Sequence, residues 1–430
     1  MTPSARIAAA IEVLAEIEAR KRPAADVLKD WGQSHRFAGA KDRAAIASLV
    51  YDAERKRSSS AFIMGEQTPR AVMLGTLRQA RNMNARDISS LCSGAPHAPA
   101  PLSQAEIERL LAADVTGAPD HVAGDFPEWL DPSLAGAFGP ALVAEARALA
   151  TRAPVDLRAN TMKTTRGKAL EALKHLGTVP TPFSPHGLRL PISPDGLGPK
   201  LSAEPAYVRG LVEIQEEASQ LAALLSCARP GEQVLDLCAG ACGKTLALAA
   251  MMQNKGQIHA ADRDGARLMR GFARLKRAGV RNVQLHAPRN GANILAGLEA
   301  RCNLVFIDAP CTGTGTWRRN PDAKWRMRPG ALAIRVADQD QLLAKAASFI
   351  KPDGRILYAT CSVLREENED RIMAFLSAHA NYSPVPVPQL AELAGLPELR
   401  RFESPFGLGL RLSPLASNTD GFFIAMLALA

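Results

Sequence analysis

Short apolar runs alternate with helix-like segments through the second half of this chain. The apolar runs occupy residues 233–237, 257–261, 282–286, 304–307, 355–358 and 422–427. Such an alternation is typical of buried strands joined by crossover helices. From residue 213 to residue 430 we therefore expect an α/β fold, a Rossmann-like, doubly wound and mostly parallel sheet.

The first half is different, and at 430 residues the chain is too long for one core. Apolar residues from Ile7 to Ile17 fall on one helical face, and similar patterns continue to about residue 120. We expect an all-helical domain over residues 1–125. Linker helices and a small α+β module should follow over residues 126–212, with a strand near 155–160.

Composition limits the possible partners and compartments. A net charge of +9 and a pI of about 9.3 favour a polyanionic partner. The seven cysteines include no Cys-x-x-Cys pair, which fits reduced thiols and argues against a structural metal site. Glu12, Glu16 and Glu18 argue against a signal peptide, and no apolar run approaches the roughly 20 residues of a membrane span. We expect a cytoplasmic monomer with no membrane partner.

Two cysteines lie in short polar turns directly after apolar runs. Cys311 lies in Asp308-Ala309-Pro310-Cys311-Thr312-Gly313-Thr314-Gly315, and Cys361 lies in Thr360-Cys361-Ser362. A doubly wound sheet places its chemistry on loops at the carboxyl ends of strands. Because a thiolate is a strong nucleophile towards carbon, the two thiols suggest covalent chemistry in two half-steps. We expect Cys92, Cys227 and Cys302 to be buried packing residues instead.

A turn of small residues connects the first of these apolar runs to the following helix. The turn consists of Cys238, Ala239, Gly240, Ala241, Cys242, Gly243 and Lys244. Backbone N–H groups in such a turn can approach a nucleotide-type ligand closely, while its two thiols are expected to pack. A phosphate-binding P-loop would need glycine at Cys238, which argues against an ATPase. Asp262 ends the next run and is placed to accept hydrogen bonds from ribose hydroxyls.

Basic residues follow Asp262 at helical spacing. Arg267, Arg270 and Arg274 fall on one stripe that is almost free of acids, so we expect it to bind phosphates. Arg318 and Arg319 add basic residues near Cys311 in sequence, and Trp325 could stack on an unpaired base. Trp325 could equally be an anchor in the core.

Several of these motifs together resemble one enzyme family. Asp236-Leu237-Cys238-Ala239 with Gly243-Lys244-Thr245 is similar to the first cofactor motif of the NOL/NOP/Sun RNA cytosine-5 methyltransferases. The turns around Cys311 and Cys361 resemble its catalytic signatures, as do the segments Arg318-Arg319, Lys324-Trp325, Glu367-Asn368-Glu369, Asp420-Gly421-Phe422-Phe423 and Leu157-Arg158-Ala159-Asn160. Residues 1–120 resemble the helical RNA-binding domain of bacterial members that act on small-subunit ribosomal RNA.

The resemblance implies an S-adenosylmethionine-dependent methylation of cytosine carbon 5 in RNA, most plausibly 16S ribosomal RNA. It assigns the attack on cytosine carbon 6 to Cys361 and the release of the product to Cys311. Asp308 is expected to contact both the cofactor and the cytosine edge. The turn from Cys238 to Lys244, with Asp262, would hold the cofactor.

Two positions depart from the family pattern. Gly240-Ala241-Cys242 replaces Ala-Pro-Gly, and His286-Ala287 lacks the Asp expected near the adenine. Two alternatives therefore stay open: a transfer RNA enzyme of the same chemistry, and a non-catalytic RNA-binding factor for ribosome assembly.

Overall fold

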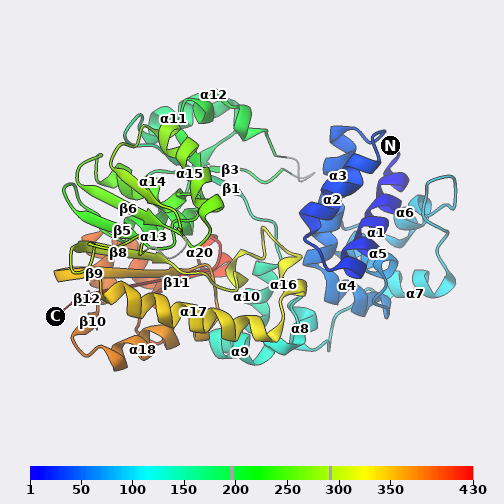
Figure 1. The fold of residues 1–430 in the computed structure, drawn as a ribbon. Helices are drawn as coiled ribbons and strands as arrows, with labels where there is room; N and C mark the ends of the chain where they lie inside the picture. The colour runs from blue at the N-terminus through cyan, green and yellow to red at the C-terminus, as the bar shows by residue number, and fades with distance from the viewer. Residues whose placement is uncertain (194–197, 290–292, 430) are drawn as a thin grey trace. The chain divides into compact units, whose positions relative to one another are not determined.

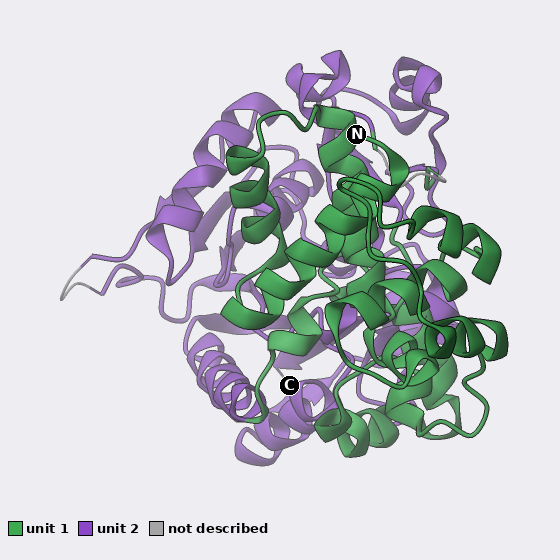
Figure 2. Ribbon diagram, turned by 90° about the vertical axis from the view of Figure 1, so that its right-hand side faces the viewer, with its two compact units in different colours: residues 1–153, 192–198, 316–329 green, residues 154–191, 199–315, 330–430 purple. Residues whose placement is uncertain are grey.

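The computed structural model describes residues 1–193, 198–289 and 293–429. They form two compact units (Figure 2). The helical unit contains residues 1–153, 192–198 and 316–329. The sheet unit contains residues 154–191, 199–315 and 330–430.

The helical unit consists of amphipathic helices, as the apolar spacing predicts. They are α1 (Pro3–Arg20), α2 (Ala24–Ser34), α3 (Ala40–Arg55), α4 (Arg57–Met64), α5 (Pro69–Gln79), α6 (Ala85–Leu91), α7 (Gln104–Ala112), α8 (Asp120–Ala123), α9 (Asp131–Phe138), α10 (Leu142–Leu149) and α16 (Ala323–Arg326) (Figure 1). Thr2 and Thr68 cap α1 and α5 by accepting backbone N–H groups. Ile7, Leu14 and Ile17 are buried, which confirms the predicted apolar face of α1.

The segment 316–329 belongs to the helical unit although it is distant from the other helices in sequence. Lys324 is 1% exposed, and its Nζ donates to the backbone oxygens of Arg55, at 3.0 Å, and Asp125, at 2.5 Å. Burial lowers the pKa of Lys324 to about 7. Trp325 Nε1 donates to the Glu54 oxygen at 2.7 Å. These bonds anchor the segment between α3 and the loop after α8.

A small antiparallel sheet opens the sheet unit. Its strand order is β2-β3-β1-β4, with β1 (Val155–Ala159), β2 (Val179–Pro180), β3 (Gly187–Leu190) and β4 (Val212–Ile214). Two helices, α11 (Arg166–Ala172) and α12 (Pro205–Val208), accompany it. This is the α+β module that the sequence predicts. Asp156 of β1 accepts a hydrogen bond from the Glu217 N–H at 3.1 Å, so the module is bonded to the segment that follows it.

The large sheet has the order β10-β12-β9-β8-β5-β6-β7, and β11 pairs with β12. Its strands are β5 (Gln233–Asp236), β6 (Gln257–Ala261), β7 (Val283–His286), β8 (Cys302–Asp308), β9 (Ile350–Thr360), β10 (Tyr382–Pro384), β11 (Leu410–Leu412) and β12 (Phe422–Leu429). The pairs among β5 to β9 are parallel, whereas β10, β11 and β12 pair antiparallel. The predicted Rossmann-like α/β fold is confirmed.

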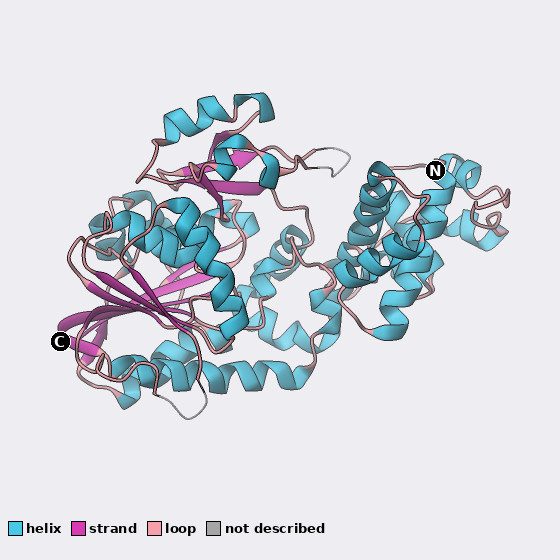
Figure 3. Ribbon diagram, turned by 45° about the horizontal axis from the view of Figure 1, so that its top comes forward, coloured by secondary structure: helices cyan, strands magenta, loops and turns pink. Residues whose placement is uncertain are grey.

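Helices cover both faces of this sheet (Figures 1 and 3). They are α13 (Glu217–Leu224), α14 (Gly243–Met251), α15 (Gly265–Ala278), α17 (Pro329–Ala347), α18 (Glu369–Ala378), α19 (Val387–Leu393) and α20 (Pro414–Ser417). The 3₁₀ turns are η1 (Glu128–Leu130), η2 (Gly139–Ala141), η3 (Lys174–Leu176), η4 (Leu201–Ala203), η5 (Thr314–Thr316), η6 (Arg365–Glu367) and η7 (Pro397–Phe402). Among the described residues, no helix is long and apolar enough to span a bilayer.

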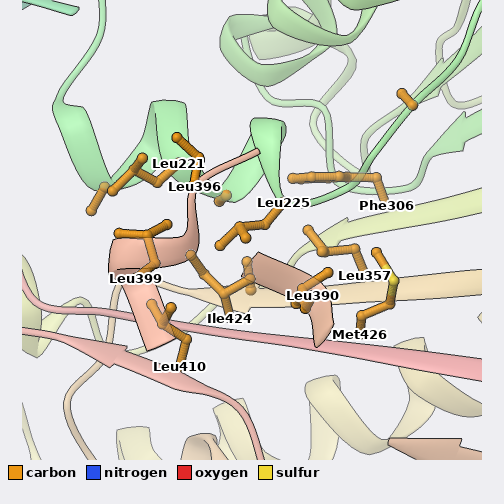
Figure 4. Close-up of a cluster of buried hydrophobic side chains, with 14 of the residues drawn as sticks. Leu221, Leu225, Phe306, Leu357, Leu390, Leu396, Leu399, Leu410, Ile424 and Met426 are labelled. Atoms are coloured by element: carbon orange, nitrogen blue, oxygen red, sulfur yellow. The ribbon is translucent and has the colours of Figure 1, made fainter. Parts of the chain in front are cut away.

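Side chains of the central strands alternate between two cores. Leu304 and Phe306 of β8 pack into one cluster with α13 and α19, as Figure 4 shows for Phe306 among leucines. Val305 and Ile307 pack into the other cluster, with α17 and α18. Because both faces are buried, the strands read as continuous apolar runs in the sequence.

The expected boundaries at residues 125 and 212 stay predictions. The compact units divide the chain at residue 153 instead, because α9 and α10 lie in the helical unit and the α+β module lies in the sheet unit.

Candidate active site

Two loops leave the carboxyl ends of the adjacent parallel strands β8 and β9. Asp308 pairs in register with Ala359, so Cys311 and Cys361 both lie just beyond the same edge of the sheet. Their Sγ atoms are 3.4 Å apart, and both residues are partly exposed. The structure therefore brings together the two thiols that the sequence distinguishes.

The two thiols are electrostatically unequal. The hydrogen bond with Cys361, followed by burial, raises the pKa of Cys311 well above its ordinary value. Cys311 therefore keeps its proton at neutral pH and can donate it towards Cys361 Sγ.

A backbone contact joins the two loops to the start of β12. Gly315 N–H donates to the Cys361 oxygen and Gly421 N–H donates to the Gly315 oxygen, both at 2.9 Å. A Cβ atom on Gly315 would lie 2.0 Å from the Gly421 oxygen. Only glycine permits this approach, which explains the glycine that closes the Cys311 motif.

Glu367 holds the Cys311 loop in place. It is 0% exposed and accepts hydrogen bonds from the Thr312 N–H at 2.8 Å, from the Thr312 hydroxyl and from Gln339 Nε2 at 3.1 Å. Gln339 Nε2 also donates to the Pro310 oxygen at 3.0 Å. Burial raises the pKa of Glu367. The loop is thus fixed on both sides of the thiol.

Asn368 holds the Cys361 loop in place in a similar way. The Thr360 hydroxyl donates to its Oδ1 at 2.6 Å, and its Nδ2 donates to the Ser362 oxygen at 3.0 Å. Sequence reasoning quoted Glu367 and Asn368 within a motif without giving them a role, and it missed Gln339. Glu367 and Asn368 could have been found from their position shortly after the Cys361 turn. No sequence pattern around Gln339 indicates its role.

Asp308 contacts the cofactor turn. Its Oδ2 lies 2.7 Å from Lys244 Nζ, an ion pair in which the lysine side chain is 11% exposed. The Lys244 ammonium also lies 5.1 Å from the centre of the Phe422 ring. This pair connects the expected cytosine-binding carboxylate to the expected cofactor turn.

A cavity of about 280 Å³ opens beside this pair. It is lined by Gln215, Glu216, Ser219, Asp236, Cys238, Ala239, Gly240, Ala241, Gly243, Lys244, Arg267, Arg274 and Asp308. Most residues of the predicted cofactor turn are among them. Cys242 and Asp262 are not.

Asp236 is a buried acid at this cavity. Its Oδ2 accepts from the Thr245 hydroxyl at 2.6 Å, while its Oδ1 has no hydrogen-bond partner among the described residues. Burial raises its pKa to about 7. An unpaired buried acceptor is a place where a ligand amino group would fit. The residues present therefore suit a ligand such as S-adenosylmethionine.

Asp262 is tied to the backbone around the turn. Its Oδ2 accepts from the Gly240 N–H at 2.7 Å and its Oδ1 from the Asp264 N–H at 2.8 Å. The residue is 9% exposed. Each carboxylate oxygen has further lone pairs, so a ribose hydroxyl could still donate to it.

The departures from the family pattern have structural counterparts. Cys242 has a left-handed backbone with φ of 62° and packs against Gly271 of α15, where a Cβ atom would lie 2.3 Å from its Sγ. His286 Nε2 lies 3.0 Å from His259 Nδ1, and its Nδ1 is 2.8 Å from the Ile294 oxygen. Both substituted residues are thus engaged in packing or hydrogen bonds.

The three arginines of the α15 stripe have different surroundings in the structure. Arg267 and Arg274 line the cavity, and Arg274 also donates to the Ala241 oxygen at 2.5 Å and pairs with Glu213 at 3.3 Å. Arg267 and Arg270 are exposed, whereas Arg274 is partly buried. Binding of RNA phosphates by this stripe stays a prediction.

The basic residues after Cys311 lie in the helical unit. Arg318 is 3% exposed and donates to the Arg152 oxygen at 3.2 Å, which leaves little of its guanidinium for phosphate. Arg319 is half-buried. Trp325 anchors the segment through Glu54, as one of the two interpretations expects.

The remaining cysteines fit a packing role. Cys92, Cys242 and Cys302 are buried, and burial raises the pKa of Cys242 and of Cys302 to about 11. Burial also raises the pKa of Cys227 and, further, that of Cys238. Among the described residues there is no group of three or more His, Cys, Asp or Glu side chains suited to a metal ion.

Known proteins are similar to this chain in sequence and in fold. Residues 223–428 match the family described as 16S rRNA methyltransferase RsmB/F. A probable ribosomal RNA small subunit methyltransferase B from Synechocystis is 31% identical over 308 residues, covering 70% of this chain and 66% of that protein. The ribosomal RNA small subunit methyltransferase B of Erwinia tasmaniensis is 34% identical over 306 residues, with the same coverage. The chain thus matches just under two thirds of the length of these relatives.

A solved structure, that of PH0851, superimposes with a TM-score of 0.72 over 99% of both chains at 27% identity. The likeness extends across both units. The matched family and these relatives place the chain in the NOL/NOP/Sun methyltransferase family that its motifs resemble, among the RsmB-like members.

Proposed function

We propose that this chain methylates carbon 5 of a cytosine in small-subunit (16S) ribosomal RNA, with S-adenosylmethionine as the methyl donor. The observation that carries the proposal is the 3.4 Å contact between Cys311 Sγ and Cys361 Sγ at the ends of adjacent parallel strands. Cys361 has to reach carbon 6 and Cys311 the proton on the adjacent carbon 5, so the two thiols must lie beside one another. The curated relatives named for ribosomal RNA methylation support the substrate.

The cavity beside Lys244 would hold the donor, which supplies an electrophilic methyl group when bound. Arg267 suits its carboxylate, and the unpaired Oδ1 of Asp236 suits its amino group. Asp262 and the N–H groups of the small-residue turn suit its ribose. Lys244 neutralises Asp308 there, so the carboxylate is fixed before the substrate arrives.

Cys361 performs the attack. Carbon 5 of cytosine is a poor nucleophile because the ring is aromatic and electron-poor. When the Cys361 thiolate bonds to carbon 6, the aromaticity is lost and carbon 5 becomes enamine-like, able to take up a methyl group. Asp308, held by Lys244, can accept a hydrogen bond from the exocyclic amino group of cytosine and so fix the ring in position for the attack.

Cys311 assists the release. After methylation the proton on carbon 5 must leave, and the bond between Cys361 and carbon 6 must break. Once Cys361 is a neutral thioether, it no longer accepts the hydrogen bond that raises the Cys311 pKa. Cys311 can then lose its proton to water more easily, and the resulting thiolate can take up the proton that leaves carbon 5.

The test is methyl transfer to defined RNA. Purified chain with methyl-labelled S-adenosylmethionine should label 16S ribosomal RNA taken from cells that lack this protein. Bisulfite sequencing should locate the label at a cytosine, and Cys361→Ala should reduce transfer to background. Label that appears only in transfer RNA, or a fully active Cys361→Ala variant, would contradict the proposal.

A non-catalytic ribosome assembly factor is the second candidate. The observation that favours it is Cys242, which stands in left-handed backbone where the family pattern has glycine. Calorimetry distinguishes the two functions: an enzyme binds S-adenosylmethionine, whereas a scaffold gives no binding heat. We further propose that the chain acts as a cytoplasmic monomer, which sedimentation of the purified protein can check.

A further inference from the structure

A large groove lies within the helical unit, and none of its lining residues is used above for chemistry. Its volume is about 1140 Å³, which exceeds that of a typical small-ligand pocket. The walls come from α1, α3, α4, α7 and the segment 316–329, all of which belong to this unit. We refer to it as the helical-unit groove.

Glu54 at the end of α3 is an unsatisfied acid in the wall of this groove. It is 2% exposed, and its Oε2 has no hydrogen-bond partner among the described residues. Burial raises the pKa of Glu54 to about 7. A buried carboxylate oxygen without a donor costs folding free energy. A ligand with N–H donors would remove that cost.

Aromatic side chains stand beside Glu54. Trp325 lines the groove, is only partly buried, and is fixed by its bond to the Glu54 backbone oxygen. Phe62 lines the groove too and is 42% exposed. The Lys324 ammonium lies 4.9 Å from the centre of the Trp325 ring, so the part of that ring that stays exposed and the Phe62 ring are suited to stacking on a nucleobase.

Basic side chains also line the groove. Arg57 pairs with Glu18, and Arg326 pairs with Asp322. Lys21, Arg109 and Arg328 line the groove, are exposed, and form no ion pair within the part of the chain that the structure describes. Two exposed acids, Glu66 and Glu128, line it as well. The lining is thus mixed in charge, and its cations can bind phosphates.

The ligand must therefore supply hydrogen-bond donors for Glu54, a flat face for the aromatic rings and negative charge for the cations. A peptide supplies N–H donors from its backbone, but it needs several residues to offer a ring and a negative charge as well. A nucleotide supplies all three features in one unit. Among the bases, guanine presents two adjacent donors, N1–H and the N2 amino group, to one carboxylate.

We propose that the helical-unit groove binds an unpaired guanine nucleotide of the RNA substrate, with Glu54 accepting from its base edge. The inference rests on the proposed RNA substrate. The groove then selects the RNA through a nucleotide other than the methylated cytosine.

Fluorescence anisotropy of labelled single-stranded UUGUU RNA with the full-length chain tests the proposal. Replacing the central guanine by inosine, which lacks the N2 amino group, should weaken binding by about tenfold, and adenine by at least as much. In Glu54→Gln, which keeps size and removes charge, the three RNAs should bind within about twofold of one another. Glu108→Gln, an exposed change on α7, is the matched control and should preserve the discrimination.

Arg109→Gln should weaken all three RNAs equally and reduce the salt dependence, because it removes a phosphate contact. If the native chain does not distinguish the three RNAs, or if Glu54→Gln still does, the proposal is wrong. It is also wrong if a basic peptide binds the native chain and loses affinity in Glu54→Gln. No methyl donor is present, so failure here leaves the methylation assay to decide the proposed function separately.

Discussion

At the candidate active site, two cysteine side chains have different chemical roles. Cys311 and Cys361 are the same chemical group 3.4 Å apart, yet the hydrogen bond between them raises the pKa of Cys311. One proton is thus held preferentially on Cys311. This inequality lets one thiol attack while the other stays protonated.

Alkylation should reveal that inequality. Iodoacetamide reacts with thiolates, so Cys311 should be modified slowly at pH 7 and faster as the pH rises beyond the ordinary thiol range of about 8.5. Mass spectrometry of peptides from timed reactions measures the rate at each cysteine. Rapid modification of Cys311 at pH 6 to 7 would contradict the raised pKa.

Glu367→Gln should impair catalysis without removing a reacting group. The amide nitrogen, in place of Oε2, would face the Thr312 hydroxyl that now donates to it and reverse that hydrogen bond, so the Cys311 loop would shift. A displacement of about 1 Å can lower kcat by about a hundredfold. The KM for S-adenosylmethionine should hardly change, because Glu367 does not line the cofactor cavity. Glu392→Gln on the exposed side of α19 is the matched control, and equal kcat values for both variants would contradict the positioning role.

The sequence allows the thiols to be found but not their supports. A cysteine in a polar turn after an apolar run is a local pattern, so Cys311 and Cys361 can be predicted from a few neighbouring letters. Gln339 comes from the middle of α17 and reaches Glu367 only because the helix packs beside both loops. Such a role depends on tertiary packing and leaves no local pattern.

At the scale of elements, the packing of α14 against α15 adapts the cofactor turn. Cys242 precedes α14, and its thiol occupies the space left by Gly271 of α15. The glycine in the middle of α15, which weakens the helix pattern in the sequence, has this packing role. The two positions should therefore be energetically coupled.

A double-mutant cycle measures the coupling. Gly271→Ala should lower the free energy of unfolding by about 1–3 kcal/mol, because its Cβ would lie 2.3 Å from Cys242 Sγ. Cys242→Gly should recover at least about 1 kcal/mol of that loss in the double variant. Urea unfolding followed by circular dichroism gives these values. Gly167→Ala, where a Cβ meets nothing within 4 Å, is the control; additive effects would contradict the coupling.

Elements differ in how well the sequence predicts them. The strands buried on both faces are visible as apolar runs, and β7 begins one residue later than the predicted run at 282. The arginines of α15 share a stripe, yet the stripe does not say which of them lie over the cofactor cavity. That depends on how α15 packs on the sheet, which places Arg267 and Arg274 at the cavity but not Arg270.

At the scale of the whole molecule, the chain leaves the sheet unit after the Cys311 loop and contributes residues 316–329 to the helical unit. Lys324 and Trp325 anchor this segment. All four tryptophans, Trp31, Trp129, Trp317 and Trp325, lie in the helical unit. Tryptophan fluorescence therefore reports on that unit alone.

Lys324→Met should change how stability depends on pH. The folded pKa of Lys324, about 7, lies below its unfolded value of 10.5, so between these values the unfolded chain binds the extra proton. The contribution of Lys324 to stability is therefore present at high pH and is lost as the pH falls towards 7. Urea unfolding followed by tryptophan fluorescence should show a larger native-minus-variant difference at pH 9.5 than at pH 7. The same difference at both pH values would contradict the lowered pKa.

The division of labour between the two thiols is the central claim, and covalent trapping tests it most directly. Cys311→Ala is incubated with labelled 16S ribosomal RNA and S-adenosylmethionine and then run on a denaturing gel. We predict a protein–RNA band that accumulates in this variant, is weak in the native chain and is absent from the Cys311→Ala/Cys361→Ala double variant. A Cys311→Ala protein that turns over at the native rate without trapping RNA, or a band that persists in the double variant, would contradict the account.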